Sequence, residues 1–83
     1  MPERKRPLLT PAQWLVLARV AQGEDNVAIG LALGIRPSTV TTHLKAIYQR
    51  LPYVSMGNKR MAAATWYLTV GQALREQEAN SDG

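Results

Sequence analysis

Residues 38–49 carry the side chains best suited to contact a polar ligand. If this stretch is helical, one face carries hydroxyl, amide and ammonium groups and no carboxylate. The face consists of Ser38, Thr41, Thr42, Lys45 and Gln49. Short polar side chains with one cation suit close approach to a polyanion whose edges offer hydrogen-bond donors and acceptors. This pattern therefore predicts a surface that binds nucleic acid.

The opposite face of the same stretch predicts a buried ridge. Val40, Leu44, Ile47 and Leu51 follow the i, i+4, i+7, i+11 spacing of an apolar helix face. The segment therefore separates into a side that packs into a core and a side that meets a partner.

Positive charge is concentrated in the middle of the chain. The net charge is +4 over 83 residues, and no Asp or Glu occurs between Asn26 and Arg75. Such a basic middle is typical of nucleic-acid-binding proteins. Apart from Lys45, four cations of this region are predicted to contact phosphates, which would give affinity without reading sequence. They are Arg36, Arg50, Lys59 and Arg60.

Length and composition argue against several other classes of protein. A chain of 83 residues without cysteine forms one small domain with no disulfide framework and no thiolate metal site. We find no nucleophile–base pair, metal cluster or glycine-rich phosphate loop, so we expect no enzyme, cofactor or metal. The longest charge-free apolar-rich stretch, 61–74, is too short to cross a bilayer, and a cytoplasmic location is expected.

Capping and breaking residues predict an all-α chain of four helices. Thr10 and Gln13 form a capping box around Pro11, whereas Gly23 ends the first helix. Asp25 caps the second helix, and the third lies between Pro37 and Pro52. The expected ranges are 11–22, 26–33, 37–51 and 59–70.

The predicted elements form a helix-turn-helix. A short helix, a turn containing Gly34 and a second helix with a polar outer face have this arrangement. We expect a flexible basic arm at 1–7, the helix-turn-helix domain at 8–74 and a polar, disordered tail at 75–83. The loop 52–58 precedes the fourth helix, which is expected to end near Gly71.

The caps, turn and core ridge together match a known family. The matching residues are Leu9-Thr10-Pro11, Val16-Leu17, Ala21-Gln22-Gly23, Asn26, Ile29, Leu33, Gly34-Ile35, Thr39-Val40, Thr42-His43-Leu44, Ile47-Tyr48 and Arg50-Leu51. From Leu9 to Ala63 the chain resembles the LuxR-type (GerE-like) helix-turn-helix domain of many bacterial response regulators. Taken as a full chain, it has no receiver or ligand-binding domain and resembles a standalone member.

The resemblance implies a transcription regulator that binds double-stranded DNA as a homodimer. In that family the third helix lies in the major groove, which places Thr41, Thr42 and Lys45 at the DNA, and the fourth helix forms the dimer contact. This chain departs from the pattern at several positions, of which three concern the second and third helices. Arg36 replaces the usual Ser or Thr cap, Thr41 replaces a common Lys, and Ala28 replaces a common Glu.

Aromatic side chains on the fourth helix predict a partner surface. Trp66 and Tyr67 cannot both point inward, because adjacent residues lie about 100° apart on a helix. With Val70, they are expected to form the dimer or partner surface, and Trp14 is also expected near the surface. An alternative function follows, in which the scaffold is a protein-binding module that sequesters or modulates a larger regulator.

Overall fold

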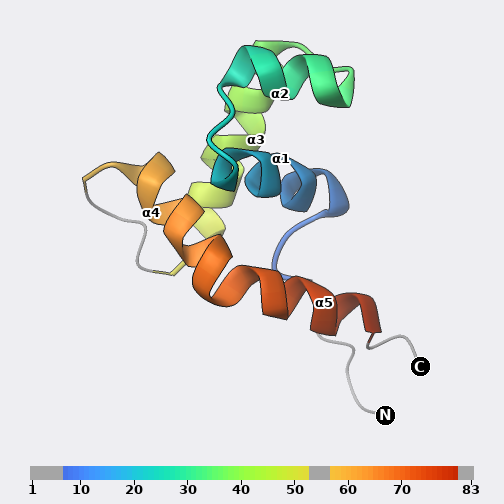
Figure 1. Cartoon of the computed structure of the whole chain (residues 1–83), viewed down its shortest axis with the longest axis vertical. Coiled ribbons are helices and arrows are strands. Elements are labelled where there is room, and N and C mark those ends of the chain that lie inside the picture. The colour runs from blue at the N-terminus through green and yellow to red at the C-terminus, as the bar shows by residue number, and fades with distance from the viewer. Residues whose placement is uncertain (1–6, 53–56, 81–83) are drawn as a thin grey trace.

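Helices are the regular secondary structure of the part of the chain that the structure describes. A computed structural model describes residues 7–52 and 57–80, and no strand occurs within these ranges (Figure 1). The helices are α1 (Pro11–Ala21), α2 (Asn26–Leu33), α3 (Pro37–Arg50), α4 (Lys59–Trp66), the π-helix η1 (Tyr67–Gly71) and α5 (Gln72–Asn80). The all-α prediction is confirmed. Residues 1–6, 53–56 and 81–83, which belong to the predicted arm, loop and tail, lie outside the described residues.

The predicted caps form at the first two helices. The Gln13 N–H donates to Thr10 Oγ1 at 3.2 Å, and the Thr10 N–H donates to Gln13 Oε1 at 3.0 Å, which completes the capping box. At α2, Asp25 Oδ1 accepts the Ala28 N–H at 2.8 Å. Local hydrogen bonds therefore determine where α1 and α2 begin, as the sequence predicts.

The turn between α2 and α3 is tight and depends on glycine. Gly34 has a left-handed φ of 71°, and the Ile35 N–H donates to the Gly30 carbonyl at 2.9 Å. A Cβ at Gly30 would lie 2.5 Å from the carbonyl oxygen of Ile35, so the turn can approach α2 this closely only at glycine. Pro37 then opens α3 at its first turn, as predicted, and Arg36 makes no side-chain cap.

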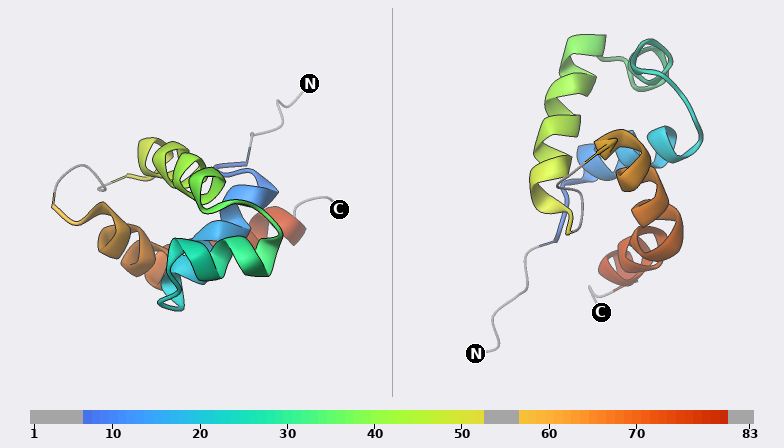
Figure 2. Two further views of the ribbon diagram at one scale, coloured as in Figure 1. Left: turned by 90° about the horizontal axis from the view of Figure 1, so that it is seen from above. Right: turned by 90° about the vertical axis from the view of Figure 1, so that its left-hand side faces the viewer.

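The core is formed where α1, α3 and α4 meet. The predicted ridge of α3 is confirmed, because its four side chains are all buried. Among the described residues, the buried hydrophobic side chains are Leu9, Trp14, Val16, Leu17, Val20, Ile29, Val40, Leu44, Ile47, Leu51, Ala63 and Tyr67. Figures 1 and 2 show α2 at one end of the molecule and α5 at the other, with α1 in the middle and α3 running from the α2 end down past α1.

The C-terminal helix differs from its prediction. It does not end near Gly71 but passes through η1, where the Gln72 N–H bonds to the Tyr67 carbonyl, and continues to Asn80. Residues 75–80 of the predicted tail are therefore helical. Gly71 does not have a positive φ. Gly71 is buried beneath Trp66, and a Cβ at this position would strike the Trp66 ring. Glycine is therefore needed here for the close contact with Trp66 and not to end a helix.

Trp14 also differs from its prediction, because only 5% of its surface is exposed. Its ring stacks on that of Trp66, with centroids 6.1 Å apart and planes 17° apart, and Tyr67 lies 6.2 Å away. The prediction of a surface position was wrong because the continued helix covers this side of α1. The next residue, Leu15, is 45% exposed.

Candidate nucleic-acid interface

The polar face of α3 is exposed along its length. Ser38, Thr41, Thr42, Lys45 and Gln49 are all solvent-exposed, on the side of the helix opposite the buried ridge. The sequence therefore predicted correctly which side chains of this helix are exposed to solvent.

Both threonines of this face donate their hydroxyl protons to the helix itself. Thr41 Oγ1 donates to the Pro37 carbonyl at 3.2 Å, and Thr42 Oγ1 donates to the Ser38 carbonyl at 3.1 Å. Each hydroxyl has one proton. In this conformation the two threonines therefore have no donor to offer a ligand, and the donors of the face lie on other side chains, Lys45 and Gln49 among them.

A hydrogen-bonded chain joins the interface to α4. Asn26, the first residue of α2, donates from Nδ2 to Thr41 Oγ1 at 3.1 Å. Arg60 donates from one guanidinium nitrogen to Asn26 Oδ1 at 2.8 Å and from the other to the Glu24 carbonyl at 2.6 Å. No pattern in the sequence indicates a contact between residues 26, 41 and 60, and Asn26 was not among the predicted site residues.

Arg60 therefore differs from the other predicted phosphate contacts. It is half-buried and two of its nitrogens bond within the fold. Its charge also acts on Tyr48 of α3, whose pKa is raised by burial and lowered in part by the nearby guanidinium. With the pKa above its usual value near 10, Tyr48 is neutral at pH 7. Arg60 thus lies between α2 and α3 as a structural cation.

Four cations remain exposed around the polar face. They are Arg36, Lys45, Arg50 and Lys59. The single ion pair between described residues lies elsewhere, from Arg19 to Glu24 at 3.1 Å. This ion pair neutralises Glu24, one of the two acidic residues that directly precede the acid-free region. Positive charge at both ends of α3, in its middle and at the start of α4 is therefore available to phosphates.

The comparison with protein families decides which proteins this chain resembles. The family model described as bacterial regulatory proteins, luxR family, matches residues 7–63. The chain belongs to the luxR family. No curated protein and no solved structure matched the chain in the corresponding comparisons. The luxR match includes α1, α2, α3 and the beginning of α4, and it ends before η1 and α5.

Membership of the luxR family makes this a helix-turn-helix domain of bacterial regulatory proteins and suggests a role in DNA-binding regulation of transcription. The luxR family is not a family of enzymes. Over the part of the chain that the structure describes, no helix is both long and apolar enough to cross a bilayer. Within the same residues, no three His, Asp or Glu side chains gather into a group that could hold a metal ion.

The predicted partner surface on the C-terminal helix differs from the structure. Tyr67 is only 5% exposed and belongs to the core, and Trp66 is half-buried against Trp14, whereas Val70 is 52% exposed. The exposed large apolar side chains of this helix are Met61, Leu68 and Val70. The prediction placed Tyr67 wrongly, because Tyr67 lies one turn after the buried Ala63 on the helix face that packs into the core.

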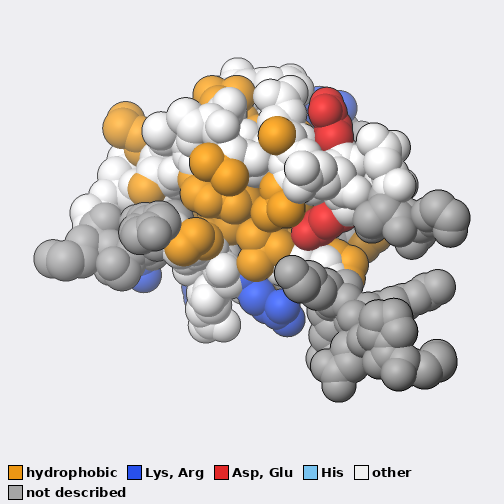
Figure 3. All heavy atoms as spheres, turned by 90° about the horizontal axis from the view of Figure 1, so that it is seen from below, with side chains coloured by type: hydrophobic (Ala, Val, Ile, Leu, Met, Phe, Trp, Pro, Cys, Tyr) orange, Lys and Arg blue, Asp and Glu red, His pale blue; other side chains and the backbone are white. Residues whose placement is uncertain are grey.

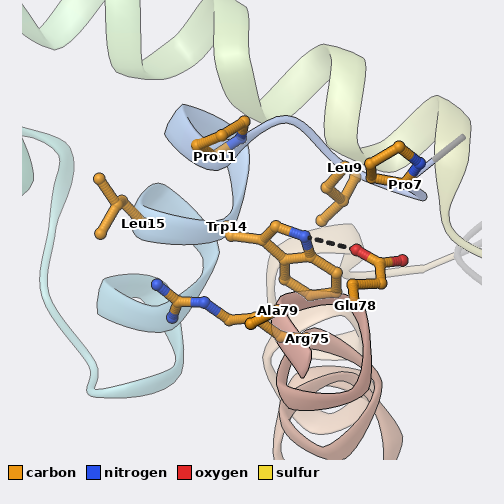
Figure 4. Close-up of a pocket in the computed structure, with 8 residues that line it drawn as sticks. All are labelled: Pro7, Leu9, Pro11, Trp14, Leu15, Arg75, Glu78 and Ala79. Carbon is orange, nitrogen blue, oxygen red and sulfur yellow. Dashed lines mark hydrogen bonds between the residues drawn. The ribbon is translucent and has the colours of Figure 1, made fainter. Parts of the chain in front are cut away.

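A shallow apolar groove lies between α1 and α5. Its volume is about 370 Å³. Its lining residues are Pro7, Leu9, Pro11, Trp14, Leu15, Arg75, Glu78 and Ala79 (Figure 4). Figure 3 shows apolar side chains gathered in the middle of the face seen from below, with an acidic group beside them. The luxR domain thus has apolar surface outside the polar face of α3.

Proposed function

We propose that this luxR-family domain is a sequence-specific regulator of transcription that lays α3 in the major groove of double-stranded DNA. The observation that carries the proposal is the acid-free, exposed face of α3, with cations at both of its ends. A major groove about 12 Å wide admits one α-helix. Regulation of transcription in a bacterium places this activity in the cytoplasm.

Each side chain of the face has a proposed role. Lys45 reaches a guanine edge, and Gln49 bonds to a base or a phosphate near the other end of the helix. Thr41 and Thr42 touch bases near the start of α3, where Ser38 contacts a phosphate. Arg36, Arg50 and Lys59 bind phosphates and give affinity that is independent of sequence. Arg60, with two nitrogens bonded internally, acts on DNA only through its charge.

The regulator is proposed to bind as a homodimer through α4 and η1. Met61 and Leu68 are 66% and 59% exposed and lie seven residues apart, close to two helical turns. They form an apolar stripe that a second copy of the chain would cover. Val70 and the half-buried Trp66 lie on a different face of the helix from this stripe.

Selection from random DNA tests the proposal. Purified protein is mixed with a pool of random duplexes at two salt concentrations, and the retained duplexes are sequenced. We expect a shared, roughly palindromic motif and an affinity that falls steeply as salt rises. Retention without a motif would reduce the function to phosphate binding, and no retention by folded protein would overturn the proposal.

The alternative function is a protein-binding module, and a feature of α2 favours it. Val27 and Leu31 are 58% and 81% exposed, and they lie one turn apart on the same helix face. Exposed apolar patches often mark surfaces for other proteins. A stoichiometric complex with a larger regulator, together with no DNA binding, would support this function instead.

A further inference from the structure

Arg60 fixes the directions of the hydrogen bonds that link α4, α2 and α3. An arginine side chain only donates, so the Asn26 atom 2.8 Å from Arg60 must be the amide oxygen. The amide nitrogen of Asn26 then faces Thr41 and donates to Oγ1 at 3.1 Å. The proton of Thr41 is therefore directed to the Pro37 carbonyl at 3.2 Å.

These bonds restrict what Thr41 can offer to DNA. Its hydroxyl accepts from α2 and donates within α3, so its only proton is used. Rotation of the hydroxyl toward a base would remove the acceptor of Asn26, which Arg60 holds in place. The polar atom is thus held toward α2, and the methyl group is the part of the exposed side chain that is free to meet a base.

Thr42 gives a contrast within the same helix. Its hydroxyl bonds to the Ser38 carbonyl alone, and no side chain of another helix holds it. It can rotate when a ligand offers a better partner. A conformational restraint from outside α3 therefore acts on the first threonine and not on the second.

We propose that Asn26 is a positioning residue for base recognition, which holds the Thr41 hydroxyl away from DNA and thereby gives Thr41 a preference for the 5-methyl group of thymine. The inference deepens the proposed function and rests on it. Thymine is the base that offers a methyl group in the major groove, and apolar contact with a threonine methyl is one way proteins read it.

Deoxyuridine provides the test, because it differs from thymidine only by lacking that methyl group. In the best duplex from the selection, each thymine is replaced singly by deoxyuridine, and affinity is measured for wild-type protein. We expect a loss of about 4-fold at one position of each half-site, the factor that corresponds to one buried methyl group. Thr41→Ser, which keeps the hydroxyl, should abolish the loss there, and Thr42→Ser should preserve it.

Asn26→Ala tests the positioning role itself. Thr41 keeps its methyl group in this variant but loses the restraint on its hydroxyl, so the thymine-to-deoxyuridine ratio should fall toward 1 at the same position. A purely structural role would lower affinity for both duplexes equally and leave the ratio unchanged. If Asn26→Ala does not fold in a thermal unfolding assay, Asn26→Leu keeps the shape of the side chain without its amide and gives the same comparison.

The outcomes separate the two proposals. A selected motif without any position sensitive to deoxyuridine, or a ratio that Asn26→Ala leaves unchanged, would overturn the positioning role while the regulator survives. Failure of wild-type protein to retain any duplex would overturn both.

Discussion

The indole nitrogen of Trp14 donates a hydrogen bond of 3.2 Å to a carboxylate oxygen of Glu78, which lies 64 residues further along the chain. The second carboxylate oxygen accepts the backbone N–H of Leu8 at 3.0 Å. One side chain of α5 therefore holds both α1 and the segment that leads into it. Glu78 lies beyond the residues matched by the luxR family model, whereas Trp14 and Leu8 lie within them.

Glu78→Gln should destabilise the domain. An amide has one acceptor oxygen, so one of the two donors would face an NH₂ group and lose its partner. Hydrogen bonds to charged groups contribute about 1.5–3 kcal/mol each, and we expect a decrease of this order in the free energy of unfolding in urea. Glu76→Gln, at an exposed position of the same helix, is the matched control. Equal unfolding midpoints for the two variants would contradict a stabilising role for the contact.

Gly71→Ala should disturb the stacked tryptophans. The new Cβ would strike the Trp66 ring, which cannot move without leaving Trp14. Overpacking of this kind costs about 1–3 kcal/mol, which outweighs the gain of up to about 1 kcal/mol in helix propensity. We expect a lower melting temperature and altered tryptophan fluorescence. Ala73→Gly, at an exposed site, should lower stability without changing the fluorescence, and an unchanged spectrum in Gly71→Ala would refute the contact.

Lys45→Ala should weaken binding to the selected operator by about 1–3 kcal/mol and relax the preference at one base position. The reason is that Lys45 is an exposed cation in the middle of the α3 polar face. Fluorescence anisotropy with the operator and with single-base variants measures both effects. An unchanged affinity would remove Lys45 from the interface.

Arg50→Ala should act differently from Lys45→Ala. Loss of a phosphate contact weakens binding to all duplexes alike, and it lowers the slope of log affinity against log salt by about 0.9. Titrations at several salt concentrations measure that slope. The ion-paired Arg19 is the control, because its replacement should leave the slope unchanged. A change in base preference with Arg50→Ala would instead show that this residue reads sequence.

Leu68→Glu should prevent dimer formation. It places a charge on the exposed stripe that Leu68 shares with Met61. Sedimentation velocity should show monomers for this variant and dimers for wild-type protein, whose half-sites we expect about 10 base pairs apart. Val27→Glu, on the exposed face of α2, is the control and should remain dimeric. A footprint that covers a single half-site would contradict the dimer.

The features that the sequence predicted best are the caps, turns and helix faces, which depend on residues close together in the chain. Thr10, Asp25 and Gly34 mark the ends of α1 and α2 correctly, because caps and left-handed turns use bonds within a few residues. The buried ridge and the exposed face of α3 also follow from spacing alone. Periodicity thus identified both sides of the recognition helix.

Contacts between distant segments could not be predicted in this way. Trp14 is buried against Trp66 and Tyr67 and bonds to Glu78, all more than fifty residues away in the chain. Gly71 is required by the Trp66 ring and not by a helix end. In the interface, the exposure of Thr41 was predictable, but its restraint depends on the packing of α2 against α3 and on the bond from Arg60 of α4 to Asn26 of α2. Single-sequence patterns carry no information on such pairs.

The π-turn also has a consequence for changes in chain length. Because the Gln72 N–H bonds five residues back to Tyr67, η1 accommodates one residue more than the α-helical pattern on either side would need. Deletion of the exposed Thr69 would allow this turn to close as ordinary α-helix, and Glu78 would still face Trp14. The C-terminal helix therefore contains a spare residue, so a one-residue deletion is best tolerated here, whereas a one-residue insertion would have to be accommodated by a second irregular turn.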